Sequence, residues 1–197
     1  MKKIIKELRI IIILITLFIS GLVIFLNYCE ARDLKAEITD IRNLMENRDY
    51  ATSKKNLSAF IKECGQAEFS NEAHLLLGQC FFNEGDYENA IYEFEGILVS
   101  KLNDSFKDEA AYFLGESYFR KKEYNIASEY YDILLENSQA DRFYQAALYG
   151  KAWVWYEQGD FKKAGEYFND LVTLWPLSKF SQSALFRLAI CSFASGD

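Results

Sequence analysis

Hydrophobic, small and polar positions recur along this chain with a period of 37 residues. Each period holds two stretches in which apolar residues return at three- and four-residue steps, a spacing that predicts two amphipathic helices joined by a turn. Equivalent positions carry similar residues: Ala73, Ala110, Ala147 and Ala184; Ala90, Ala127 and Ala164; Phe94, Tyr131 and Phe168; and Gly85, Lys122, Gly159 and Gly196 at the turn. Repeats of this length predict an all-α solenoid, in which each helix pair buries its apolar face against its neighbours.

The period divides the chain from residue 34 onward into predicted units. They are a degenerate unit at 34–70, full units at 71–107, 108–144 and 145–181, and a unit at 182–197 that stops after its first helix. In the degenerate unit, Arg48-Asp49-Tyr50 takes the place of Gly85-Asp86-Tyr87, and terminal repeats are commonly atypical. The last predicted helix is apolar on more than one side. We therefore expect that the chain is a fragment of a longer array or that a partner covers this end.

Particular residue types are expected at the turns and at the helix crossings. Gly85 and Gly159 can take a left-handed backbone without steric cost, and Asp86 and Asp160 are placed to cap the helices that follow. Lys122 stands at this turn position in the unit 108–144, which predicts the most strained or the most altered turn of the array. The small residues expected to let helices pack closely are Gly78, Ala90, Gly115, Ala127, Ala152 and Ala164.

The N-terminal part of the chain has a different pattern. Residues 10–26 carry no charge, and the segment 1–26 holds four basic residues and one acidic residue. This pattern predicts a cytoplasmic N-terminus at 1–9, a transmembrane helix at 10–26 and a linker at 27–33. The repeats would then lie outside the cytoplasm. Two alternatives stay open: a cleaved signal peptide, or a lipoprotein in which Cys29 carries the lipid.

Composition narrows the function further. The net charge is −7, and the chain from residue 27 onward has 18 basic and 28 acidic residues. An acidic body with no basic stripe argues against nucleic-acid binding. With His74 as the only histidine and no phosphate-binding motif, the sequence predicts no enzyme, metal, cofactor or small-molecule substrate. Cys80 and Cys191 stand three periods apart, at a position that Ser117 and Val154 fill in the units between. We interpret this position as a small packing site rather than a redox site.

The repeated motifs resemble the tetratricopeptide repeat, over roughly residues 34–197. One unit reads Leu77-Gly78-x-x-Phe81, Gly85-Asp86-Tyr87 and Ala90-x-x-x-Phe94. The next two show the same pattern with Leu114-Gly115-x-x-Tyr118, Tyr124 and Ala127-x-x-x-Tyr131, and with Ala152-x-x-Trp155, Gly159-Asp160-Phe161, Ala164-x-x-x-Phe168 and Pro176. No unit has the family's tryptophan. The link at 175–184 resembles that of cell-envelope members, namely the Tol-Pal system coordinator and the outer-membrane assembly lipoproteins.

This resemblance implies that the first helix of each unit lines a concave groove for a protein or peptide ligand. Mapped onto this sequence, the main groove candidates are Tyr112, Glu116, Tyr149, Trp153, Tyr156 and Phe186. Leu75, Gln79 and Ile190 fall on the same predicted face. Helical phase favours packing between first helices for Phe82, Phe119 and Phe193, and exposure in the groove for Tyr112, Tyr149 and Trp153.

Together these patterns predict a non-catalytic scaffold of the bacterial cell envelope. The expected protein is anchored in the inner membrane by 10–26, and its periplasmic repeats hold a partner protein or peptide near the membrane, which raises the partner's local concentration. An outer-membrane lipoprotein and a self-associating structural repeat protein are the alternatives.

Overall fold

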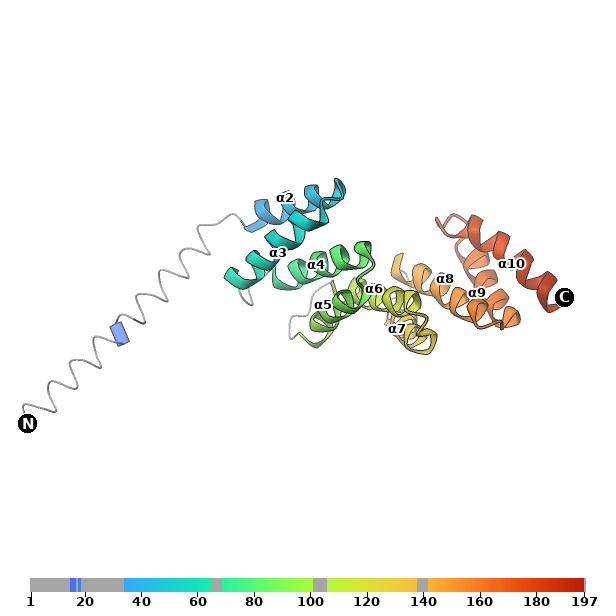
Figure 1. The fold of residues 1–197 in the computed structure, drawn as a ribbon. Coiled ribbons are helices and arrows are strands. Elements are labelled where there is room, and N and C mark those ends of the chain that lie inside the picture. Colours follow the sequence, from blue (N-terminus) through green and yellow to red (C-terminus); the bar gives the residue numbers. More distant parts are fainter. Residues whose placement is uncertain are drawn as a thin grey trace, which may run out of the picture. The chain divides into compact units, whose positions relative to one another are not determined.

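The computed structural model describes residues 34–64, 69–100, 106–137 and 142–196, together with Ile15, Thr16 and Phe18. Within these ranges every regular element is a helix (Figure 1). The chain separates into two compact units, residues 1–43 and 44–197. The boundary falls inside α2, which runs from Leu34 to Glu46. The predicted transmembrane segment 10–26 lies almost entirely outside the described residues, and none of the described helices is long and apolar enough to cross a membrane.

Helices of 13 to 16 residues follow one another through the unit 44–197. They are α3 (Tyr50–Cys64), α4 (Ser70–Glu84), α5 (Tyr87–Val99), α6 (Phe106–Arg120), α7 (Tyr124–Asn137), α8 (Arg142–Glu157), α9 (Phe161–Leu174) and α10 (Ser181–Ser195). Each of them packs against the next in the chain, and α6 also packs against α4 and α8. The even-numbered helices α4, α6 and α8 are therefore the first helices of successive pairs that stack on one another, as the repeat pattern predicts.

The turns inside the helix pairs share one backbone geometry. Gly85 and Gly159 have φ values of +83° and +80°, and Lys122 and Arg48 take the same left-handed region at +63° and +60°. The turn at Lys122 is thus strained rather than altered, because a side chain there costs free energy that glycine avoids. Arg48 shows that the degenerate unit keeps the turn of the full units.

Aspartates cap the helices that follow three of these turns. The carboxylates of Asp49, Asp86 and Asp160 accept hydrogen bonds from the backbone N–H groups three residues later, at donor–acceptor distances of 3.1, 3.3 and 3.1 Å. An N-cap carboxylate satisfies a helix N–H that has no partner within the helix. These bonds explain why an aspartate follows the turn residue in three of the four described pairs.

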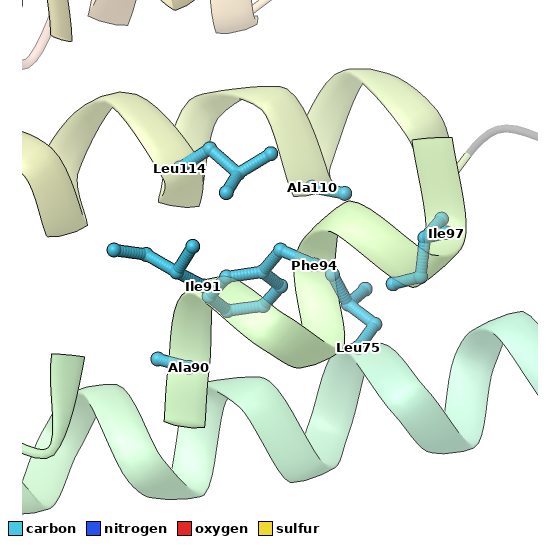
Figure 2. Close-up of a cluster of buried hydrophobic side chains, with 7 residues drawn as sticks. All are labelled: Leu75, Ala90, Ile91, Phe94, Ile97, Ala110 and Leu114. Carbon is cyan, nitrogen blue, oxygen red and sulfur yellow. The ribbon is translucent and has the colours of Figure 1, made fainter. Parts of the chain in front are cut away.

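The core of the array lies where an aromatic side chain of a second helix enters between two first helices. Figure 2 shows Phe94 of α5 between Leu75 of α4 and Leu114 of α6. Gly78 makes room for this ring, since a Cβ atom there would lie 2.5 Å from Phe94 Cε1. Gly115 has the same role against Tyr131, at 2.6 Å. The predicted alanine positions, Ala90, Ala127, Ala152 and Ala164, are fully buried.

The cysteine position of the repeat is also a packing position. Cys80, Ser117, Val154 and Cys191 are at most 1% exposed. Ser117 Oγ donates a hydrogen bond of 2.7 Å to the carbonyl of Phe113, which lets a hydroxyl replace a thiol at a buried site. Burial raises the pKa of the Cys80 thiol to about 12 and also raises that of Cys191. Both thiols are therefore protonated at neutral pH and are poor nucleophiles.

Candidate functional site

A pocket of about 360 Å³ opens where the first helices α6 and α8 lie side by side. Three groups of residues line it: Tyr112, Glu116, Phe119 and Arg120 from α6; Tyr149, Gly150, Trp153 and Glu157 from α8; and Tyr131 of α7 with Phe180, which directly precedes α10. The α8 residues Tyr149, Trp153 and Glu157 are spaced by four, so one face of that helix supplies them. The pocket is therefore built from equivalent helices of two consecutive repeats.

Tyr131 fixes the distance between the two first helices. Its side chain is fully buried, and Gly115 of α6 and Gly150 of α8 both face its ring. A Cβ atom at either glycine would lie 2.6 or 2.5 Å from ring carbons, so the helices approach the ring more closely than any side chain allows. The two glycines and the ring together form the packed layer beside the pocket.

The hydroxyl of Tyr131 connects this layer to the only carboxylate of the pocket that is not exposed. It donates a hydrogen bond of 2.8 Å to Glu116 Oε1. Burial raises the pKa of the Glu116 carboxyl, while the Tyr131 hydrogen bond and the positive charge of Arg120 act in the opposite direction. Burial beside Glu116 also raises the pKa values of Tyr112 and Tyr131. Both phenols are protonated at neutral pH, and Tyr131 remains a donor.

Aromatic rings form the other wall of the pocket. Tyr149 stacks on Phe180 at 5.0 Å between ring centroids and meets Trp153 edge-on at 6.1 Å. The Tyr149 hydroxyl lies 2.8 Å from Ser183 Oγ of α10, which holds the ring in place. On α10, the guanidinium of Arg187 lies 4.4 Å from the centroid of the Trp153 ring, a cation–π contact.

The structure brings together four of the six main groove candidates. Tyr112, Glu116, Tyr149 and Trp153 all line the pocket, and Tyr156 contacts Trp153 with ring centroids 5.3 Å apart. Phe186 does not line the pocket; it lies on α10 with 64% of its surface exposed.

Two of the other expectations are wrong. Leu75 is only 3% exposed and belongs to the core around Phe94, because the first helices are covered on more of their circumference than helical phase suggests. Phe193 was expected to pack between first helices but is 89% exposed. Phe82 packs edge-on against Phe113 as expected, and Phe119 both contacts Tyr124 and lines the pocket. Trp153 is both partly exposed in the groove and packed against the core, since it lines the pocket and contacts Phe168.

Helical phase alone does not predict several residues that line the pocket. Phe180 lies in the link between repeats, and helical phase predicts no groove role for Gly150 or Tyr131. One signal was available for Tyr131: the equivalent positions hold Phe94 and Phe168, and a buried tyrosine in place of phenylalanine needs a hydrogen-bond acceptor nearby. Glu116 is that acceptor.

A second hollow of about 320 Å³ lies against α4 and α5. His74, Tyr92, Glu93, Glu95, Gly96 and Val99 line it. His74 Nδ1 lies 2.6 Å from Glu93 Oε2, so the histidine already has a partner. Among the described residues no three histidine, cysteine, aspartate or glutamate side chains gather as metal ligands would.

Comparison of the sequence with models of known protein families finds a match. The sequence profile of the tetratricopeptide repeat matches residues 41–105 and 112–179, which confirms the resemblance found in the motifs. A search of curated proteins finds no match. The cell-envelope subtype remains a prediction.

Solved structures share the fold at low sequence identity. A crystal structure of MamA is 19% identical, with a TM-score of 0.65 over 78% of this chain and 83% of that chain. The repeats of a putative kinesin light chain from Podosopora anserina are 14% identical, with a TM-score of 0.67 over 83% of this chain and 86% of that one. YrrB, described as a TPR protein with an unusual peptide-binding site, is 14% identical, with a TM-score of 0.63 over 87% and 84%.

Proposed function

The chain belongs to the tetratricopeptide repeat family, and on this premise we propose that it binds an extended peptide segment of a partner protein against α6 and α8. The observation that carries the proposal is the pocket between these helices, which offers aromatic rings and a partly buried carboxylate. Such pockets hold the anchor side chains of peptides, and the polar groups around them fix the register. YrrB, which shares the fold and is described as having an unusual peptide-binding site, supports peptide binding as a use of this fold.

The role we propose is that of a scaffold rather than an enzyme. We further propose that residues 10–26 anchor the chain in the bacterial inner membrane and that the repeats act in the periplasm. The uncharged run and the basic residues before it support this arrangement. Tethering would then keep the bound partner close to the membrane surface.

Photo-crosslinking from single positions tests the binding role. A benzophenone amino acid replaces Glu157, at the pocket, or Glu166, an exposed residue of α9 outside it, in the full chain expressed in bacterial cells. We expect a discrete adduct from position 157 that is absent from position 166 and that disappears when Tyr112→Ala is added. The same adducts from both positions, or none from either, would refute peptide binding at this surface.

Protease protection tests the location. A C-terminal tag should be cleaved from outside in spheroplasts, while the mass of the mature protein retains residues 1–26. A chain that begins at a lipid-modified Cys29 would establish the lipoprotein alternative. A tag that stays protected would place the repeats in the cytoplasm and refute export.

A further inference from the structure

We propose that the pocket between α6 and α8 binds the lysine or arginine side chain of a partner peptide, with the Glu116 carboxylate as its counter-charge and the surrounding aromatic rings as its walls. This inference rests on the proposed peptide-binding function and specifies the chemistry that the site recognises. Three observations carry it: the charges in the pocket, the arrangement of the rings, and a guanidinium that already lies on one of those rings.

The charges of the pocket favour a cationic guest. Glu116 and Glu157 contribute carboxylates, and Arg120 contributes the one opposing charge among the lining residues. A carboxylate can accept about four hydrogen bonds, whereas among the described residues Glu116 accepts one, from Tyr131. A cation in the pocket would favour the ionised form of Glu116, against the burial that raises its pKa. Arg120 influences Glu116 through its charge without a direct ion pair between them in the described structure. Glu116 therefore keeps capacity for a donor that enters the pocket.

The rings of the pocket favour the same guest. Tyr112, Phe119, Tyr149, Trp153 and Phe180 all contribute to the lining. The face of an aromatic ring attracts a cation, and the attraction is stronger when the cation leaves water. An ammonium or guanidinium group would gain this attraction from the walls and an ion pair with Glu116 at the same time.

The chain itself shows that this aromatic cluster accepts a guanidinium. Arg187 of α10 lies 4.4 Å from the centroid of Trp153 and 5.4 Å from that of Tyr156. Arg187 is not among the residues that line the pocket, although Trp153 is.

Other guests fit the pocket less well. An acidic side chain would face the carboxylates of Glu116 and Glu157. Arg120 is the one cation of the lining, and Arg187 lies outside the lining, on Trp153. A neutral aromatic side chain would cover Glu116 without supplying a charge, and burying an ionised carboxylate without a partner is costly. The volume of about 360 Å³ suits one side chain rather than a folded element.

The test selects peptides on the full chain, held in detergent micelles because residues 10–26 are uncharged. A phage library of random twelve-residue peptides is panned on the immobilised protein. Selected peptides are mapped by crosslinking from a benzophenone amino acid at position 119, an uncharged lining position, so that Glu116 and Glu157 both stay in place. For each peptide that maps to the pocket, binding to the wild type and to Glu116→Gln is measured by fluorescence anisotropy. Variants of each peptide are also made in which one basic residue at a time is replaced. Norleucine replaces a lysine and citrulline replaces an arginine.

The expected result is a double-mutant cycle with strong coupling. Replacing one basic residue of the peptide should weaken binding to the wild type about tenfold, which corresponds to ~1.4 kcal/mol. The same replacement should change binding to Glu116→Gln less than about twofold. Glu166→Gln is the matched control, because it removes the same charge from α9, outside the pocket. Glu166→Gln should leave the preference for the basic residue of the peptide intact.

Each other outcome refutes something different. Peptides that bind the pocket without a basic residue, or a basic residue whose loss costs the same in wild type and Glu116→Gln, would overturn the cation inference and leave peptide binding standing. If Glu116→Gln and Glu166→Gln weaken peptide binding equally, the preference for a basic residue would reflect general attraction by an acidic protein. That result would also overturn the cation inference. Failure to select any peptide that crosslinks at position 119 would overturn both proposals.

Discussion

Tyr131 is the residue on which the packing between two repeats depends. Its ring is enclosed between Gly115 and Gly150, and its hydroxyl holds Glu116 at the pocket. The fold and the site therefore share one side chain. A change that moves this ring is expected to alter both the spacing of α6 and α8 and the position of the carboxylate.

A methyl group at either glycine should destabilise the protein. We expect Gly115→Ala and Gly150→Ala each to lower the free energy of unfolding by about 1–3 kcal/mol, because the new Cβ overlaps the Tyr131 ring. Gly96→Ala is the control: it lies inside α5 with no atom near its Cβ position, so it should gain up to about 1 kcal/mol of helix propensity. Urea unfolding followed by circular dichroism measures all three variants. Stabilisation by Gly115→Ala would show that the ring can move aside.

At the turn residue Lys122, replacement by glycine is expected to stabilise the protein. Its φ of +63° lies in the region that favours glycine, and Gly85 holds the equivalent position at +83°. Relief of the left-handed strain outweighs the entropy that glycine loses on folding. We therefore expect Lys122→Gly to raise the free energy of unfolding by about 1 kcal/mol.

Gly85→Ala is the converse variant and serves as its control. Nothing lies near the Cβ position of Gly85, so any loss of stability would come from the backbone alone. It should destabilise by a similar amount in the same urea titration. If Lys122→Gly is neutral while Gly85→Ala is costly, the side chain of Lys122 contributes contacts that offset its strain.

At the scale of the helix, the starts of the second helices differ in their caps. Asp86 and Asp160 accept hydrogen bonds at the starts of α5 and α9, whereas Glu123 precedes α7 and its side chain makes no such bond in the described structure. Instead Glu123 pairs with Lys121 at 3.2 Å, an exposed contact that contributes little. Glutamate, with its longer side chain, is not among the preferred N-cap residues, whereas aspartate is.

Shortening that side chain should create the missing cap. We expect Glu123→Asp to raise the free energy of unfolding by up to about 1 kcal/mol at pH 7. Hydrogen bonds from Asn89 lower the pKa of the Asp86 carboxyl, so its cap is present above the ordinary carboxyl pKa and is lost as the pH falls through the lowered value. The gain of Glu123→Asp should disappear on acidification in the same way. Thermal unfolding over a series from pH 7 to pH 2 measures this, and a gain that persists at pH 2 would rule out capping by the carboxylate.

At the scale of the whole molecule, the sequence predicted the features that recur in every repeat. It did not predict the features that depend on how one repeat packs against the next. The period of 37 residues predicted the helix pairs, the turn that Arg48 retains and the small residues beside Phe94, because equivalent positions do equivalent packing. Helical phase also placed Tyr112 and Trp153 toward one surface. It could not locate Phe180, which reaches the pocket through a link whose path depends on how consecutive pairs pack. Nor could it predict that Leu75 is buried.

Stability at alkaline pH is expected to depend on groups spread over several repeats. Burial raises the pKa of Cys80 from 9.0 to about 12, and burial together with the charge of Glu95 raises that of Tyr118 from 10.0 to about 12. In the unfolded chain these groups lose their protons near their ordinary pKa values, while the folded protein retains them. The contribution of these two groups to the free energy of unfolding should therefore be constant below their ordinary pKa values, and the free energy of unfolding should fall as the pH rises from about 9 toward 12.

Substitution at Cys80 separates this effect from general charge repulsion. Cys80→Ser should keep the fold, because Ser117 occupies the equivalent position and donates to the carbonyl of Phe113, for which Leu76 is the counterpart in α4. A serine hydroxyl does not ionise in this range, so the urea midpoint should fall less between pH 8 and pH 10.5 than in the wild type under reducing conditions. Tyr92→Phe, whose site is 75% exposed, should leave the slope unchanged. Equal slopes for Cys80→Ser and the wild type would mean that the net charge of the acidic protein, and not the buried thiol, sets its alkaline limit.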